Sequence, residues 1–439
     1  MEDENGAAHR AGPYSYYVVG VLMLAYVCSF VDRTILSLLV DPIKQDLQLS
    51  DVQISLLAGF AFAMFYTGMG IPFGWLADRS DRKRIIFFGV IAWSLMTAAC
   101  GLARSFGGLF AARIGVGVGE ASLSPASYSL IPDLFPRDQL GLAGSIYAAG
   151  ITIGGGLAMM LGGAAIQGLT AYGAMSLPVL GTLAPWQLAF VLVGLLGLPV
   201  ALLVLTIRDP RTATSKASRG EKAGLRDTLA YVWQRRPAYV PVLTGYSLMV
   251  VVNYALVIWV PTYFVRVHGM SAGEIGLTMG AMMLFAGTAG MFAGGLISDW
   301  MTRRGVPEAP LWVVLASVIG QAPFFIAAML VGDVTTALAL MAVAVFLITL
   351  NGGIQGATFQ VLTPSKMHGQ VVAIFLVVAN IIGLGFGPLM IGLFTDKLFG
   401  DPALIGRSLA LAAAIVLPLS AIFIALALPR ARAQIDSIT

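Results

Sequence analysis

The chain has 439 residues, of which 58% are apolar and only 11% are charged, with a formal charge of +4 and a mean hydropathy of +0.86. A soluble chain carries about 25% charged residues, so this composition excludes a soluble enzyme, a disordered chain and a nucleic-acid binder. The two cysteines and three histidines are scattered, which argues against a disulfide framework or a metal site. The acidic N-terminus shows no signal-peptide pattern. The sequence therefore predicts an integral membrane protein of all-α class.

Twelve apolar stretches are long enough to cross a membrane as helices, which takes about 20 residues each. An even number of spans places both termini on one side. Most of the 26 Lys and Arg residues fall on that side, so the positive-inside rule predicts that both termini are cytoplasmic. The predicted spans are 14–40, 50–77, 83–104, 107–133, 138–167, 184–206, 238–266, 272–300, 309–331, 336–362, 368–397 and 405–428. The opposite loops hold Lys44, Arg104, Arg266, Lys397 and Arg407.

Span 1 carries Asp32 and Arg33 well inside its apolar segment. Ionisable residues within a membrane are rare and costly, and they indicate a functional site by default. Arg33 is a candidate for binding an anion such as a phosphate, because a guanidinium gives bidentate contacts. Asp32 is expected to restrain Arg33 between turnovers and to take part in proton coupling.

The loop after span 2 reads GWLADRSDRKR over residues 74–84, and a weaker copy, GLISDWMTRR, follows over 295–304. In each copy a Gly is followed four residues later by an Asp, namely Asp78 and Asp299, and then by basic residues. A loop that only orients insertion needs no Gly and Asp at a fixed spacing, so we expect a gating role, with a purely topogenic loop as the alternative. The expected gating residues are Gly74, Asp78, Arg79, Arg82, Lys83 and Asp299.

Span 4 contains RIGVGVGEASLSPA, with Arg113 and Glu120 seven residues apart. That spacing is almost two helical turns, so the two side chains share a face about 10 Å apart along the axis. A buried glutamate can exchange a proton when its access to water and to an arginine changes. Glu120 is therefore the main candidate for proton coupling, and Arg113 is a second candidate for binding an anion. A permanently paired structural network is the alternative.

The polar stretch 207–237 separates two sets of six spans and is predicted to be a cytoplasmic linker. It carries either a short surface helix at about 220–235 or no regular structure. The linker divides the chain into an N-terminal half, 1–206, and a C-terminal half, 238–439.

The two halves share further features. Gly150-x-x-x-Gly154 in span 5 corresponds to Gly383-x-x-x-Gly387 in span 11, and the loop motif also occurs once in each half. These repeats predict duplication of a six-helix unit. Two such halves with a substrate site between them are a known transporter architecture.

Spans 7 to 11 carry no charged residue in their central portions. One charged wall facing a largely apolar wall suits an amphiphile with an ionic headgroup and a hydrocarbon tail. A lining of Met and Phe, such as Met282, Met283, Met291 and Phe285, favours that substrate, whereas a lining of Asn and Gln favours a polar one. The expected substrate-binding residues are Arg33, Arg113, Glu120, Asn253, Tyr254, Asn351, Gln355 and Asn380.

The GWLADRSDRKR stretch resembles the cytoplasmic loop signature of the major facilitator superfamily, and ARIGVGVGEASLSPASYSLIPDLFPRDQ, with the FVDR of span 1, is similar to the spinster family. The chain departs from the superfamily pattern at Asp81, where Gly is usual, and at Gly155, where the exporter motif has Pro. The resemblance implies the major facilitator fold. Animal spinster proteins export sphingosine-1-phosphate or carry lysophospholipids, and the family's essential charged pairs fall on Asp32 with Arg33 and on Arg113 with Glu120.

The sequence therefore predicts a secondary active transporter that works by alternating access and moves an amphiphilic anionic, lysophospholipid-like or sphingolipid-like substrate with protons. The alternative is a proton-coupled carrier of small organic anions such as sugar acids. A membrane sensor is not expected, because both tails are short, and neither is an enzyme, because no catalytic or nucleotide-binding motif is present. The expected partners are the small amphiphilic substrate, protons and membrane lipid, with no cofactor, no metal and no nucleic acid. The expected protein is a multi-pass monomer of the bacterial inner (plasma) membrane.

Overall fold

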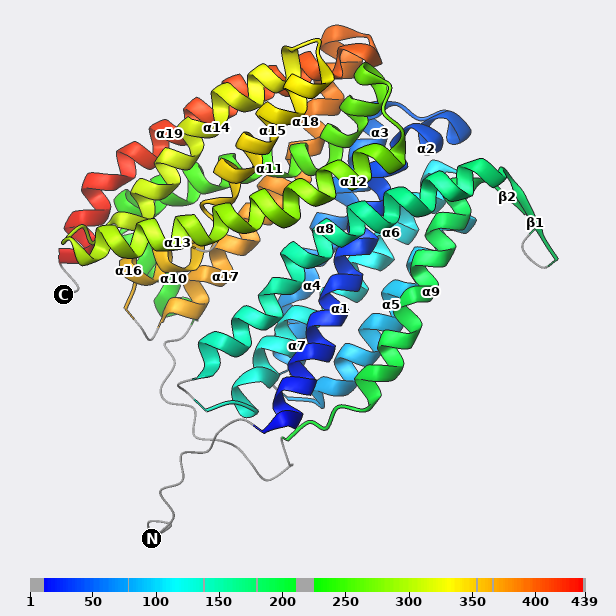
Figure 1. Cartoon of the computed structure of the whole chain (residues 1–439). Coiled ribbons are helices and arrows are strands. Elements are labelled where there is room, and N and C mark those ends of the chain that lie inside the picture. The colour runs from blue at the N-terminus through cyan, green and yellow to red at the C-terminus, as the bar shows by residue number, and fades with distance from the viewer. Residues whose placement is uncertain are drawn as a thin grey trace.

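The computed structural model describes residues 12–77, 79–136, 139–178, 181–210, 225–352, 354–364 and 367–436. The described chain is helical apart from one small antiparallel hairpin, in which β1 (Met175–Leu177) pairs with β2 (Gly181–Leu183). Figure 1 shows the helices in two groups that meet at one end and spread apart toward the other.

Each group begins with a long helix, and both contain short π-helical or 3-10-helical segments labelled η. The first group contains α1 (Pro13–Leu38), α2 (Val40–Leu47), α3 (Asp51–Ser55), η1 (Leu56–Phe60), α4 (Ala61–Ala77), α5 (Arg82–Leu102), α6 (Phe106–Glu120), α7 (Leu123–Leu130), η2 (Ile131–Asp133), α8 (Leu140–Tyr172) and α9 (Pro185–Leu205). A short helix, α10 (Leu225–Gln234), lies in the predicted linker. The second group contains α11 (Arg236–His268), α12 (Ala272–Met282), η4 (Met283–Gly287), α13 (Thr288–Arg303), α14 (Ala309–Leu330), α15 (Val334–Thr349), α16 (Gln355–Leu362), α17 (His368–Ala379), η6 (Asn380–Phe386), α18 (Gly387–Leu393), η7 (Phe394–Phe399), η8 (Pro402–Leu404) and α19 (Ile405–Asp436).

Helices occupy every range that the sequence predicts as a span. In the described chain, ten helices are long and apolar enough to cross a membrane, and α15 is a shorter apolar helix. The predicted span 107–133 is broken, because α6 ends at Glu120 and α7 begins at Leu123. Pro125 accounts for the break, since its ring clashes with the carbonyl four residues earlier and it has no N–H to donate. The β1–β2 hairpin departs from the all-helical prediction.

Short polar side chains cap several helices by accepting hydrogen bonds from free backbone N–H groups. The Asp81 carboxylate accepts from the Lys83 N–H at 3.0 Å and so begins α5. Asp81 has a φ of −64°, so this position needs no glycine. At α15, Asp333 accepts from the Thr336 hydroxyl and N–H, and these hydrogen bonds lower the pKa of the Asp333 carboxyl.

Both groups use glycine to pack a later helix onto their first long helix. A Cβ added at Gly154 of α8 would lie 2.9 Å from the Val27 Cα of α1. At the repeated position, a Cβ added at Gly387 would lie 2.4 Å from the Val251 carbonyl oxygen of α11. Only a glycine allows helices to approach this closely, and the shared contact supports the predicted duplication.

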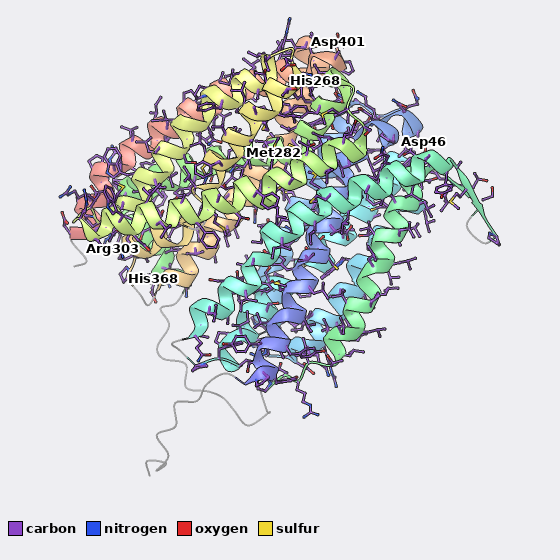
Figure 2. All side chains as sticks on the ribbon, in the orientation of Figure 1. Asp46, His268, Met282, Arg303, His368 and Asp401 are labelled. Carbon is purple, nitrogen blue, oxygen red and sulfur yellow. The ribbon has the colours of Figure 1, made fainter. Side chains whose placement is uncertain are left out.

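The ends of the described chain lie on one side of the bundle, here called the linker side. At the start of α1, the Tyr14 hydroxyl accepts from the Arg208 N–H at 2.6 Å, and near the end of α19 the Gln434 amide donates to Tyr231 of α10 at 2.9 Å. Figure 2 places His368 and Arg303 toward this side of the second group and His268 and Asp401 at its opposite end. The opposite side is called the distal side.

The two groups are joined by polar bonds on the distal side. Every hydrogen bond and ion pair between described residues of α1–α9 and α11–α19 lies there, in keeping with Figure 1, where the groups spread apart toward the linker side. These bonds join Asp41 to Arg266, Asp51 to Arg266, Val52 to Asp396 and Ser55 to Pro388.

Candidate functional site

Four charged side chains lie together inside the first group of helices. Asp32 and Arg33 come from α1, and Arg113 and Glu120 come from α6. Asp32, Arg113 and Glu120 are at most 2% exposed, whereas the Arg33 side chain is 18% exposed. Burying a charge is costly unless it has a partner, so the partners of these four residues define the site. No group of three or more His, Cys, Asp or Glu among the described residues is placed to hold a metal ion.

Arg33 and Glu120 form the central ion pair. The Arg33 Nε lies 2.6 Å from the Glu120 Oε2, and the Ser29 hydroxyl donates to the same oxygen at 2.6 Å. The other carboxylate oxygen, Oε1, is buried without a hydrogen-bond partner. Glu120 is the last residue of α6, directly before the break that Pro125 causes. The pair therefore ties the broken helix to α1.

Asp32 does not restrain Arg33, contrary to the prediction from the sequence. Its carboxylate accepts a short hydrogen bond from the Thr97 hydroxyl of α5. Consecutive residues of a helix point in different directions, so Asp32 faces α5 while Arg33 faces α6. Asp32 remains close enough to Glu120, Arg113 and Arg33 to interact with them electrostatically.

Arg113 is buried more deeply than Arg33 and is bound mainly by backbone. Its Nε donates to the Leu57 carbonyl at 3.4 Å, and its Nη1 is buried without a hydrogen-bond partner. Arg113 makes no ion pair with a described residue, so the shared helical face predicted for it and Glu120 does not bring the two into contact.

Three aromatic rings surround Arg33, and the sequence reasoning missed them. The Arg33 Cζ lies 5.1 Å from the ring centroid of Phe30, 4.7 Å from that of Phe62 and 4.6 Å from that of Tyr66. The i, i+4 spacing of Phe62 and Tyr66 is the signal available in the sequence, because it places both rings on one face of α4.

The residues predicted to bind substrate from the second group divide into two sets. Tyr254 of α11 lies close enough to Arg33 for an electrostatic interaction, and the neighbouring Asn253 Oδ1 is buried without a partner. Asn351 and Gln355 bond to each other, with the Gln355 amide donating to the Asn351 Oδ1 at 3.0 Å. The Asn351 amide also donates to the Ile348 carbonyl near the end of α15. The side chain of Asn380, at the start of η6, makes no hydrogen bond with a described residue, and its backbone N–H donates to the end of α17.

The predicted apolar lining is partly accessible. Phe285 is 73% exposed, and Met282, which Figure 2 labels, and Met283 are half-buried. The Met283 methyl lies 3.2 Å from the position of a Cβ added at Gly155 of α8, so Met283 contacts the first group.

Within the loop motif, Arg82 has the strongest contacts. Its side chain is fully buried and donates to Asp209, to Asp133 at 2.5 Å and to the Ser129 carbonyl at 2.6 Å. Asp209 follows α9 and Asp133 ends η2, so this cluster lies wholly within the first group. Sequence reasoning anticipated Arg82 but neither aspartate.

The other predicted gating residues are less constrained. The Arg79 Cζ lies over the Trp75 ring, 4.1 Å from its centroid. The Lys83 ammonium donates to the Leu205 carbonyl at 3.1 Å. A Cβ added at Gly74 would meet only the Pro125 Cβ at 4.0 Å, so no helix approaches Gly74 closely enough to require a glycine there. Asp299 is exposed and makes no ion pair with a described residue. Asp78 lies outside the described residues.

A cluster on the distal side, missed by sequence reasoning, closes the space between the two groups. Arg266 donates to Asp41 at 2.8 Å and to both oxygens of Asp51 at 2.8 and 2.9 Å, and Lys44 donates to Asp51 at 2.6 Å. The Arg266 side chain is 9% exposed and that of Asp51 is fully buried. We call Asp41, Lys44, Asp51 and Arg266 the distal lock.

The sequence from residue 22 to residue 388 matches the family described as Major Facilitator Superfamily. The chain belongs to the Major Facilitator Superfamily. It is accordingly a multi-pass integral membrane protein and a transporter of this superfamily, which confirms the resemblance drawn from the loop motif.

Within the superfamily, solved and curated proteins give nearer relatives. One solved relative is a bacterial homologue of the human lysosomal transporter Spinster, in an inward-facing and unoccupied conformation. Its crystal structure matches this chain with a TM-score of 0.79 at 28% identity, and the match covers 97% of this chain and 98% of the relative. An MFS-type efflux pump of Mycolicibacterium smegmatis is 28% identical over 98% of this chain and 96% of its own length. A hexuronate transporter of Bacillus subtilis is 28% identical over 87% of this chain and 88% of its own length. The resemblance to the spinster family is confirmed by the structural match.

Proposed function

We propose that the protein is a proton-coupled secondary transporter of an amphiphilic anionic, lysophospholipid-like or sphingolipid-like substrate. The observation that carries this proposal is the Arg33–Glu120 ion pair, in which an accessible cation is held by a carboxylate that a proton can neutralise. When Glu120 binds a proton, its attraction for Arg33 falls, and the uncompensated charge of the guanidinium attracts a substrate anion more strongly.

The asymmetry between the two groups supports an amphiphile. The buried charges of the site all come from α1 and α6, while Asn351 and Gln355 of the second group hydrogen-bond to each other. Phe285, Met282 and Met283 offer apolar surface on the second group. A headgroup on the charged wall and a hydrocarbon tail on the other wall would satisfy both surfaces.

The distal lock supports alternating access. In the described structure the polar bonds between the groups are confined to the distal side, so the site would be reached from the linker side. We propose that the linker side is cytoplasmic, that residues 1–206 and 238–439 are the units that rock, and that 207–237 connects them. The bacterial inner membrane, monomeric state and contact with membrane lipid belong to the same proposal.

A second candidate is a proton-coupled carrier of small organic anions such as sugar acids. The hexuronate transporter of Bacillus subtilis, which is 28% identical over 87% of this chain, favours it. The same Arg33 and Glu120 would serve, but the apolar wall would have no partner.

Thermal unfolding of the purified protein with a ligand panel tests the proposal. The panel contains lysophosphatidate, lysophosphatidylglycerol, sphingosine-1-phosphate, glucuronate and galactonate at acidic and neutral pH. A ligand that binds only the folded protein raises its melting temperature. We expect the amphiphiles to raise the melting temperature of the wild type and of the Arg104→Ala control, but not that of Arg33→Ala. Stabilisation by the sugar acids alone would replace the amphiphile with the second candidate, and an equal response in Arg33→Ala would remove the proposed anion site.

A further inference from the structure

We propose that Phe30, Phe62 and Tyr66 are positioning residues that hold the Arg33 guanidinium by its faces, so that its free edge binds the substrate anion. This inference rests on the proposed function and deepens it. It assigns the anion to one of the two candidate arginines and adds three residues that no charge pattern indicates.

The three rings come from two helices and meet at one cation. Phe30 lies almost one helical turn before Arg33 in α1, and Phe62 and Tyr66 lie one turn apart in α4. The rings of Phe62 and Tyr66 are stacked, with centroids 5.1 Å apart and planes at 18°. All three centroids lie within the distance, about 6 Å, at which a guanidinium is attracted to a ring face. The cage therefore fixes Arg33 between α1 and α4.

The edge of the guanidinium that carries Nη1 and Nη2 is available. Arg33 bonds to Glu120 through Nε, and neither Nη atom makes a hydrogen bond with a described residue. Most of the donors of an arginine lie on these two nitrogens, in a fork that matches two oxygens of a phosphate or a carboxylate. Because the side chain is 18% exposed, a ligand can reach this fork without breaking the bond to Glu120.

Ring faces are suited to this task because they use none of the hydrogen-bond donors of the cation. A second carboxylate partner would occupy Nη1 or Nη2, whereas the rings attract the whole planar charge. The rings also keep their attraction when Glu120 is neutral, so Arg33 stays in place in both protonation states of its partner.

Arg113 lacks these properties. It is 1% exposed, its Nε is bonded to a backbone carbonyl, and its Cζ lies 5.7 Å from the Phe62 ring alone. The accessible anion site is therefore Arg33, and the ligand class is an anion with two oxygens on one centre, as in a phosphate ester or a carboxylate.

Substitutions of Tyr66 test the cage, because its hydroxyl makes no hydrogen bond with a described residue and only its ring is invoked. We expect Tyr66→Leu to weaken binding about tenfold, from the loss of one desolvated cation–π contact. Tyr66→Phe keeps the ring face and should bind as the wild type does. Phe110→Leu removes a half-buried ring whose described ring contact is with Phe106, and it serves as the matched control.

The probes are lysophosphatidate and glucuronate, measured separately by isothermal titration. Unchanged binding in Tyr66→Leu, or equal weakening in Tyr66→Phe, would overturn the inference. A structure of Tyr66→Leu by electron microscopy gives a readout without ligand, in which we expect Arg33 to leave its position. If neither probe binds the wild type, the proposed function fails, while an unmoved Arg33 in that structure would separately overturn the positioning role.

Discussion

Glu120 uses its two oxygens differently. Oε2 accepts from both Ser29 and Arg33, while Oε1 has no partner among the described residues. A proton on Oε1 would displace neither donor from Oε2, and the ion pair would become a weaker hydrogen bond from the charged guanidinium to a neutral carboxyl group. One protonation event at this residue changes the charge seen by Arg33 while the geometry stays intact.

Glu120→Gln fixes this position in its neutral form. We expect transport in the variant to lose its pH dependence, because the residue proposed to exchange the proton is gone. The measurement is uptake of the identified substrate into proteoliposomes at acidic and neutral pH. Glu274→Gln, in an exposed capping box of α12, is the control and should keep the wild-type profile. A pH profile that persists in Glu120→Gln would move the coupling to another group, with Asp32 the next candidate.

Arg82 stabilises the fold of the first group on its linker side. Its fully buried guanidinium bonds to two aspartates and a backbone carbonyl, so removing it breaks both of these ion pairs at once. Breaking a buried ion pair costs about 3–5 kcal/mol, and we expect Arg82→Leu to lower the free energy of unfolding by that order. Arg84→Leu, at a side chain that is 77% exposed, should change it by less than about 0.5 kcal/mol. Equal melting temperatures for the two variants would show that the Arg82 cluster is not structural.

Among the elements, several helix pairs join the groups through glycine. In α8 and α12, a Cβ added at Gly163 would lie 2.5 Å from the Ala272 carbonyl oxygen, and one added at Gly276 would lie 2.4 Å from that of Met159. Between η1 and η6, a Cβ added at Gly59 would lie 2.4 Å from the Leu384 carbonyl oxygen. These neighbours are backbone atoms, which cannot turn away as a side chain can. These glycines therefore allow the close packing between the two groups that is seen with the distal side closed.

Gly163→Ala should push the protein out of that state. The added methyl group clashes only while α8 and α12 are in contact, and overpacking costs about 1–3 kcal/mol. We expect the population with an open distal side to rise, measured by distances between spin labels on the distal ends of α8 and α12. Gly168→Ala, on the same helix with no atom within 4 Å, is the control and should leave the distances unchanged. Unchanged distances in Gly163→Ala would mean that the contact is not specific to one state.

The sequence predicts the helices well, because a membrane span is a property of composition and length alone. It also identifies Arg33, Arg113 and Glu120, since a charge within an apolar run stands out without any knowledge of the fold. The break of the fourth span at Pro125 is visible in the same way, although the prediction treated that span as continuous.

The partners of those charges are less predictable. Arg33 and Glu120 are 87 residues apart, and Arg266 and Asp51 are 215 apart, so only tertiary packing brings them together. Thr97, Phe62 and Tyr66 are ordinary residues of a membrane helix. The i, i+4 spacing of Phe62 and Tyr66 places both rings on one face of α4, but it does not tell whether that face meets a cation or lipid. The expectation that Asp32 holds Arg33 fails for a related reason, because neighbours in sequence face different helices.

On the scale of the whole molecule, the distal lock is the set of ion pairs proposed to hold the distal side closed. Arg266 is the single cation of the second group in the lock, and it bonds to Asp41 and Asp51 of the first group. Arg266→Gln removes the charge while keeping a hydrogen-bonding side chain. We expect the variant to open the distal side, measured by spin-label distances between α2 and η8 on either side of the lock.

Arg407→Gln is the matched control for this variant, because Arg407 is an exposed arginine near the distal end of α19. It should leave the distances as in the wild type. If the distal side stays closed in Arg266→Gln, closure depends on the glycine contacts rather than on the ion pairs. If the melting temperature also falls in that case, the role of Arg266 is structural.

The chemistry of the distal lock has a thermal consequence. Ions lose hydration free energy as temperature rises, so the cost of drying a buried ion pair falls on warming. Closure of the distal side should therefore become more favourable in a warm membrane than in a cold one. The linker side has no described ion pair between the two groups, and its opening and closing would follow a different temperature dependence. Warming alone should therefore lengthen the time that the transporter spends with its distal side closed, without any change in ligand or proton gradient.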